Sequence, residues 1–211
     1  MAMTDTVLIE RIGPCEGAAL WAKRAAALIL GVAAMAVLAK AKVPMWPSPV
    51  PINLGTFGVL VIGAAYGWRL GLATMLAYLA VGAIGFDVFA SSTAENNGLA
   101  YMLGSTGGYL AGYLVAVVIL GMASRAGWDR KVVKSLVAMI AASAAIYALG
   151  VPWLHQWIGA SGLYDADAFA TPLAQTFAWG LTPYLIGDAI KLALAALLIP
   201  AVWKLLGDAR G

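Results

Sequence analysis

Long, uninterrupted stretches of apolar residues recur along almost the whole chain. A run of about 18 or more such residues is long enough for an α-helix to cross a hydrocarbon core roughly 30 Å thick. These runs are apolar on every face and rich in Leu and Ala, whereas strands of a membrane β-barrel alternate polar and apolar residues. Only 11% of the 211 residues are charged, against about 25% in an ordinary soluble domain. The sequence therefore predicts an all-α integral membrane protein.

Six membrane-spanning helices are predicted, packed in one compact bundle. The spans are placed at about 21–39, 52–67, 69–86, 104–123, 132–152 and 181–203. The second and third are divided only by a tight turn near Gly67. The last connection is expected to run from Pro152 to Gly180. Residues 1–20 are expected to form a cytoplasmic segment, 21–206 a single membrane domain and 207–211 a cytoplasmic tail.

The basic residues predict the orientation of the bundle. Ten of the 13 Lys and Arg residues fall in segments on the same side as the N-terminus if there are six spans. Only Lys40 and Lys42 fall on the other side, and Lys191 lies within the last span. Because cytoplasmic segments are enriched in Lys and Arg, both termini are predicted to be cytoplasmic.

Several classes of function are disfavoured by what the sequence lacks. A single Cys and a single His leave no cluster for a metal ion, so neither a metal nor a cofactor is expected. The stretch GSTGGYLAG lacks the Gly-Lys-Ser/Thr ending of a phosphate-binding loop, so the chain is not expected to hydrolyse ATP itself. No paired carboxylates or nucleophile–base motif indicates an enzyme, and no nucleic-acid partner is expected.

Two opposite charges stand within the apolar stretch LTPYLIGDAIKLALAALLIPAVW, residues 181–203. Asp188 and Lys191 are three residues apart, so they share one helix face, and Tyr184 joins them one turn earlier. Counted from Gly180, they would lie about 12 and 16 Å along the helix. They could brace the bundle as a structural ion pair. We favour a ligand or ion site in a cavity, because intramembrane charges are costly and usually functional.

Two further stretches carry polar residues near predicted helix starts. In VPINLGTFGVL, Pro51 suits a helix start, and Asn53 and Thr56 could be either interfacial or functional. In LGSTGGYLAGYL, the pair Gly108 and Gly112 allows close helix packing, and direct ligand contact stays open as the alternative.

The same glycine-rich stretch could also bind an amphipathic anion. Ser105 and Thr106 precede the predicted helix, whose exposed N–H groups attract anions. Tyr109 adds an aromatic face with a hydroxyl group.

Three blocks, in this order and spacing, resemble the BioY family of biotin-specific substrate-binding components of energy-coupling-factor transporters. They are KVPMWPSPVPINLGTFGVLVIGAAYGWRLGLATMLAYLAVGAIGFDVFA, GSTGGYLAGYLVA and LTPYLIGDAIKLALAALL, which together cover residues 42 to 198. The resemblance implies a six-helix bundle in the bacterial inner membrane that binds biotin near its outer surface. It also implies a transmembrane coupling subunit and ABC-type ATPases as partners, so that ATP acts only through them.

The resemblance also implies which residues contact biotin. Asp188 and Lys191 match the Asp-x-x-Lys of the last helix, and Asn96 or Asn97 matches the loop after the third span. The glycine block places Gly107 at the site. Two positions depart from the family pattern, because Ser105 and Asp87 stand where Pro is usual, and these changes bear on loop geometry.

The chemistry of biotin is compatible with this set. Its ureido ring has two N–H donors for Asp188 and one carbonyl acceptor for a Lys or Asn donor. Its thioether ring suits aromatic walls such as Tyr78, Tyr109 and Tyr184. Lys191 or the 105–108 turn could bind the carboxylate, and the sequence leaves this choice open. The alternative function is an ion-coupled secondary transporter of another small solute, with Asp188 as the titrating group.

Overall fold

The computed structural model describes residues 6–14 and 16–208, and these residues are almost entirely helical. Seven α-helices and three short 3-10 helices alternate with connections, and the one sheet in this part of the chain has two residues per strand. In chain order the elements are η1 (Leu8–Arg11), α1 (Gly17–Lys40), β1 (Lys42–Val43), β2 (Ile52–Asn53), α2 (Gly55–Ala83), α3 (Gly98–Met102), α4 (Gly107–Arg125), η2 (Trp128–Arg130), α5 (Val132–Ser161), α6 (Pro172–Gly180), η3 (Thr182–Tyr184) and α7 (Leu185–Asp208).

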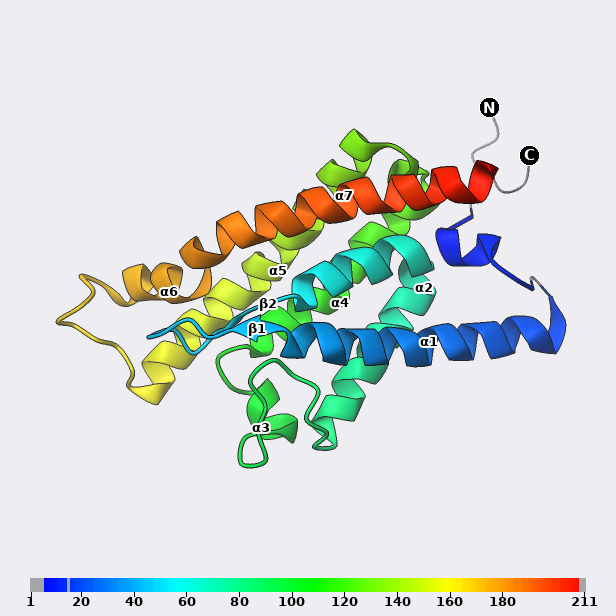
Figure 1. Ribbon diagram of the computed structural model, residues 1–211. Helices are drawn as coiled ribbons and strands as arrows, with labels where there is room; N and C mark the ends of the chain where they lie inside the picture. Colours follow the sequence, from blue (N-terminus) through cyan, green and yellow to red (C-terminus); the bar gives the residue numbers. More distant parts are fainter. Residues whose placement is uncertain (1–5, 15, 209–211) are drawn as a thin grey trace.

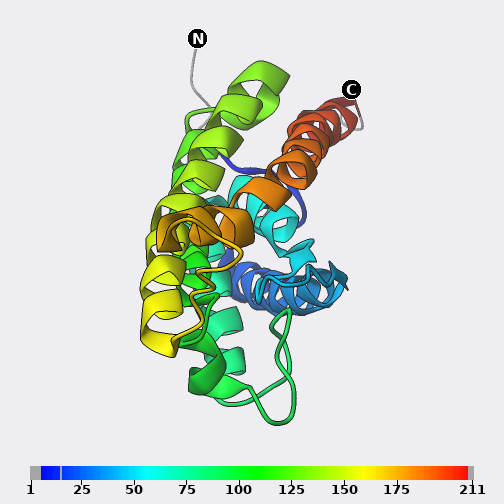
Figure 2. The ribbon, with the colours of Figure 1, turned by 90° about the vertical axis from the view of Figure 1, so that its left-hand side faces the viewer.

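The long helices pack as one bundle around α2 and α4 (Figures 1 and 2). α4 lies between α2 and α5, α1 covers one side of α2, and α7 packs across α2 and α5. Five helical stretches in the described residues are long and apolar enough to cross a membrane, with α6 and α7 counted together as one of them. This agrees with the predicted all-α membrane fold.

The second and third predicted spans are the two halves of α2. Gly67 interrupts that helix with φ 73° and ψ 170°, a backbone conformation that glycine adopts without a Cβ penalty. Figure 1 shows the chain reversing direction there, so that residues 55–66 and 68–83 run as two separate helices. The turn predicted at this glycine is confirmed.

Close packing of α4 on α5 accounts for the glycine pair in α4. A methyl group on Gly112 would lie 2.7 Å from the Cα atom of Ile146, and one on Gly108 would lie 2.5 Å from the carbonyl oxygen of Leu149. Both contacts are with the backbone of α5, which cannot move aside as a flexible side chain could. The packing interpretation of this pair is therefore confirmed.

The fifth helix is longer than predicted. Pro152 was expected to begin a connection, but α5 continues through it to Ser161. Proline removes one helical hydrogen bond, and neighbouring helices compensate for such losses in membrane proteins. Here the added turns are fixed by Leu154 and Ile158, which are fully buried. The connection that follows is correspondingly shorter and contains α6, which was not predicted.

The two ends of the bundle differ in structure. η1 and the C-terminal end of α7 lie together beside the turn at Gly67 (Figure 1). The opposite end carries the connections that hold β1 and β2, α3, and α6. In the predicted tail 207–211, residues 207 and 208 belong to α7 and the rest lie outside the described residues.

Candidate functional site

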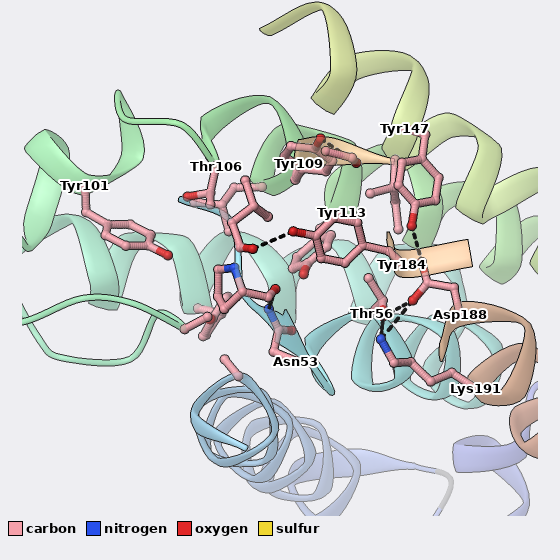
Figure 3. A pocket seen from close by; sticks show the side chains of 18 residues that line it. Asn53, Thr56, Tyr101, Thr106, Tyr109, Tyr113, Tyr147, Tyr184, Asp188 and Lys191 are labelled. Atoms are coloured by element: carbon pink, nitrogen blue, oxygen red, sulfur yellow. Dashed lines mark hydrogen bonds and ion pairs between the residues drawn. The ribbon is translucent and has the colours of Figure 1, made fainter. Parts of the chain in front are cut away.

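A pocket lies among the helices near the end that carries β1, β2, α3 and α6 (Figure 3). Segments from every part of the chain contribute to it, from the last turn of α1 to the first turns of α7. Its polar and aromatic lining consists of Asn53, Thr56, Tyr78, Tyr101, Thr106, Tyr109, Tyr113, Tyr147, Tyr184, Asp188 and Lys191.

Asp188 and Lys191 line this pocket and contact each other. The Nζ atom of Lys191 lies 2.8 Å from the Oδ1 atom of Asp188, and the two residues are 7% and 8% exposed. They are therefore turned into the bundle rather than toward lipid. A brace hidden behind packed helices would have no void beside it, whereas this pair forms part of a cavity wall.

The position of the pair along the helix differs from the prediction. α6 ends at Gly180 and a 3-10 turn follows, so α7 begins only at Leu185. Asp188 consequently lies in the first turn of α7, about 4–5 Å from its start, and Lys191 about one turn later. The helix macrodipole favours a carboxylate at this position, which lowers the cost of burying Asp188.

Thr56 and Tyr147 complete a polar cluster around the carboxylate. The hydroxyl of Tyr147 donates to the Oδ2 atom of Asp188 at 2.5 Å. Thr56 in the first turn of α2 accepts from Lys191 at 3.1 Å and donates to the Oδ1 atom of Asp188 at 3.4 Å. Three helices thus fix one carboxylate and one ammonium group in place (Figure 3).

The other tyrosines form an aromatic wall whose rings are held by their hydroxyl groups. Tyr78 donates to the carbonyl of Val88 at 3.0 Å, and Tyr109 donates to that of Gly180 at 2.8 Å. Tyr184 donates to the carbonyl of Val50 at 2.5 Å, which ties the proline-rich segment to the start of α7. These bonds leave the ring faces, rather than the hydroxyls, available for an apolar part of a ligand.

Six of the ten residues predicted for the site line the pocket: Asp188, Lys191, Tyr78, Tyr109, Tyr184 and Thr106. Asn96 and Ser105 instead line a neighbouring cavity, which shares Tyr101 and Thr106 with the main pocket. The amide of Asn97 donates to the carbonyls of Thr93 and Ala94 and is folded back on its own turn. Gly107 provides space for Trp153, which lies against it.

Sequence reasoning missed several pocket residues. Tyr113 lies one helical turn after Tyr109, and this i,i+4 spacing could have revealed it. Tyr147 is a single tyrosine in a largely apolar stretch, and nothing local indicates that it contacts α7. Asn53 and Thr56 were considered and left open, and the structure places both in the pocket wall.

The loop 84–97 lies beside the pocket, because its residue Ala90 belongs to the lining, and the loop is tied to the end of α1. The Lys40 ammonium contacts the Asp87 carboxylate at 2.5 Å, and the hydroxyl of Ser92 donates to the same oxygen at 2.6 Å. These hydrogen bonds, first from Lys40 and then from Ser92, hold the pKa of Asp87 below its usual range. Asp87, one of the two departures from the family pattern, therefore anchors this loop.

Within residues 6–14 and 16–208, no three His, Cys, Asp or Glu side chains gather in a way that could hold a metal ion.

Comparison with known proteins places the chain in a family of transporters. Residues 10–208 match the model of the BioY family. The chain is 30% identical to a probable biotin transporter BioY of Pyrococcus horikoshii, across 84% of this chain and 94% of that protein. It is 33% identical to the biotin transporter BioY of Rhodobacter capsulatus, across 80% of this chain and 88% of that protein.

The fold also matches a solved structure. A crystal structure of the S-component for biotin from an ECF-type ABC transporter superposes with a TM-score of 0.72 at 22% identity, covering 90% of this chain and 95% of that one. The likeness at this identity concerns the fold and supports a multi-pass membrane protein. Together with the family match over nearly the whole length, it leads to one conclusion: the chain belongs to the BioY family.

Proposed function

We propose that this protein is the high-affinity biotin-binding component of an energy-coupling-factor vitamin importer. The observation that carries the proposal is the buried Asp188–Lys191 pair, which lines a tyrosine-walled pocket in a chain of the BioY family. The protein captures biotin from outside the cell, and partner subunits supply the energy of ATP for import.

The pocket suits a small molecule that has a polar head and an apolar body. Asp188 offers a carboxylate acceptor to the ureido N–H groups, and Lys191 has an N–H beyond the two it already uses. The rings of Tyr78, Tyr109 and Tyr184 provide surfaces for the thioether ring. Biotin would thereby replace water in a site whose charges are already paired, so its hydrogen bonds form in a low-dielectric environment.

The residues outside the main pocket have a different proposed role. Asn96 and Ser105 line the adjoining cavity, and Asn97 lies in the loop 84–97 nearby. Closure of this loop over bound biotin would bring Asn96 or Asn97 to the ligand. Thr106, which lines both cavities, is the proposed contact for the carboxylate tail of biotin.

The membrane topology follows from the same proposal. The two halves of α2 cross as separate spans, so the chain crosses the bacterial inner membrane six times with both termini in the cytoplasm. The end that carries the pocket then faces outward. A transmembrane coupling subunit and a pair of ABC-type ATPases are the expected partners.

Titration of purified protein in detergent tests the proposal most directly. Biotin is expected to bind tightly without ATP, while thiamine and riboflavin produce no saturable heat. Asp188→Asn is expected to weaken biotin binding at least about tenfold, because it removes a charged acceptor. The absence of biotin binding by the wild-type protein would exclude the proposal.

Uptake measurements separate this function from ion-coupled transport. Biotin uptake by cells that express the chain is expected to require the partner ATPases. Uptake that persists without any ATPase and collapses with a protonophore would instead identify an ion-coupled transporter with Asp188 as the titrating group.

A further inference from the structure

Six tyrosines line the pocket, and the O–H donors of two of them, Tyr101 and Tyr113, have no acceptor in the part of the chain that the structure describes. The hydroxyls of Tyr78, Tyr109, Tyr147 and Tyr184 each donate to a protein oxygen, and that of Tyr101 accepts from the backbone N–H of Ser91. The hydroxyl of Tyr113 has no hydrogen-bond partner among residues 6–14 and 16–208, although the residue is only 8% exposed.

The hydroxyl of Tyr113 is not among the atoms that are shut away from solvent without a partner, so it opens onto the pocket. A ligand that fills the pocket must supply a partner or leave this donor unpaired, at a cost on the order of 1–3 kcal/mol, and most buried side-chain polar groups in proteins have a partner. Tyr113 lines the pocket, so the partner of its hydroxyl must come from the contents of that pocket. The arrangement is that of a donor held ready for a ligand.

The hydroxyl lies at the charged end of the pocket. A methyl group on Gly55 would be 3.1 Å from the Tyr113 oxygen, so this oxygen sits beside the first residue of α2. The next residue, Thr56, is bonded to both Asp188 and Lys191. Nearby, the Oδ1 atom of Asn53 is occupied by the N–H of Gly55 at 2.7 Å. Tyr113 is thus placed to act on the same part of a ligand as the ion pair.

We propose that the hydroxyl of Tyr113 donates a hydrogen bond to the ureido carbonyl oxygen of biotin and so determines specificity for that oxygen. This inference rests on the proposed function. A ureido group has two N–H donors beside one carbonyl acceptor, whose oxygen has two lone pairs. Asp188 accepts from an N–H, while Tyr113 and the remaining N–H of Lys191 supply the two donors that the oxygen can accept.

A two-by-two comparison tests the contact. The ligands are biotin and 2-thiobiotin, in which sulfur, a weaker acceptor, replaces the ureido oxygen. The proteins are the wild type and Tyr113→Phe, which keeps the ring. Wild-type protein is expected to bind biotin about tenfold or more tightly than 2-thiobiotin through this contact. Tyr113→Phe is expected to bind biotin about tenfold more weakly than the wild type does and to lose most of the preference for biotin over 2-thiobiotin.

Tyr66→Phe is the matched control for the loss of a buried hydroxyl. Tyr66 donates to the carbonyl of Ala27 at 3.0 Å and does not line the pocket, so its variant is expected to keep both the affinity and the preference. Equal preference in wild type and Tyr113→Phe would overturn the inference. The inference would also be overturned if Tyr113→Phe altered the preference for biotin over biotin methyl ester and left the preference for biotin over 2-thiobiotin unchanged. That result would place the hydroxyl at the carboxylate of the ligand.

Failure of the Tyr113 inference can be distinguished from failure of the proposed function. If wild-type protein binds no biotin, the function itself is wrong. If it binds biotin and Tyr113→Phe behaves as wild type does, only the role of Tyr113 is wrong. Should Tyr113→Phe not fold, 3-fluorotyrosine placed at position 113 keeps the shape and strengthens the donor. It is expected to increase the preference for biotin over 2-thiobiotin, and an unchanged preference would contradict the assignment.

Discussion

The hydroxyl of Tyr147 on α5 donates to the Oδ2 atom of Asp188 on α7 at 2.5 Å, while Lys191 binds the other carboxylate oxygen at 2.8 Å. The carboxylate is therefore oriented from two sides before any ligand arrives. An acceptor that is fixed in this way loses little conformational freedom on binding, which contributes to affinity.

Tyr147→Phe is expected to weaken biotin binding by roughly 10–100-fold. A hydrogen bond to a charged group contributes about 1.5–3 kcal/mol, and each 1.4 kcal/mol corresponds to about a factor of ten in Kd. Without it, Asp188 can rotate away from the ureido N–H groups. Isothermal titration of the purified variant measures the effect, and an unchanged Kd would show that Lys191 and Thr56 suffice to orient Asp188.

The Asp188–Lys191 pair can be tested as brace and as ligand site at the same time. Asp188→Asn alone leaves the Lys191 ammonium buried without its counter-ion, and breaking such a pair costs roughly 3–5 kcal/mol. The double variant Asp188→Asn with Lys191→Met removes both charges, so its melting temperature is expected to recover toward that of the wild type. Biotin binding by the double variant is expected to stay at least about tenfold weaker than that of the wild type. Thermal unfolding and titration with biotin in the same detergent distinguish the two roles. A double variant that binds biotin normally would show that the ion pair only stabilises the bundle and does not bind the ligand.

Local signals in the sequence predict the framework of this molecule well. Long apolar runs require helices, and Gly67 beside Arg69 predicts the reversal within α2. The spacing of Asp188 and Lys191 places them on one face of α7 whichever helices surround them. These features depend on neighbouring residues alone, so one sequence is enough to find them.

Contacts between distant segments could not be predicted in the same way. Tyr147 reaches Asp188 only because α5 and α7 pack side by side, and no pattern within either helix encodes that register. α5 passes through Pro152 because Leu154 and Ile158 are buried against other segments. The start of α7 depends on the turn after Gly180, so counting residues from that glycine misplaced the ion pair along the helix.

Gly112→Ala is expected to destabilise the protein by about 1–3 kcal/mol, the usual cost of overpacking. The added methyl group would meet the backbone of Ile146 at 2.7 Å and force α4 away from α5. Gly159→Ala is the matched control, since nothing lies within 4 Å of a methyl group at that position of α5. Its stability is expected to rise slightly, because alanine favours helix over glycine. Equal melting temperatures of the two variants would show that the helix contact tolerates a methyl group.

A buried carboxylate at the other end of the bundle makes stability depend on pH. Asp129 in η2 is 2% exposed, and its Oδ2 atom accepts from the indole N–H of Trp203 at 2.6 Å. Its Oδ1 atom has no hydrogen-bond partner in the described residues. Burial raises the pKa of Asp129 to about 6 from its ordinary 3.8, although the bond from Trp203 and the charge of Arg130 oppose this change.

The raised pKa means that the carboxyl group of Asp129 holds its proton more tightly in the folded protein than in the unfolded chain. Asp129 therefore stabilises the fold most at low pH. That contribution is lost as the pH rises from about 4 through about 6, and it is then absent. Asp129→Asn keeps an acceptor for Trp203 but cannot ionise, so its stability relative to wild type is expected to increase by on the order of 2–3 kcal/mol between pH 4.5 and 7.5. Melting curves of both proteins across that range measure the difference. Parallel pH profiles for the two proteins would mean that Asp129 is already ionised throughout the range.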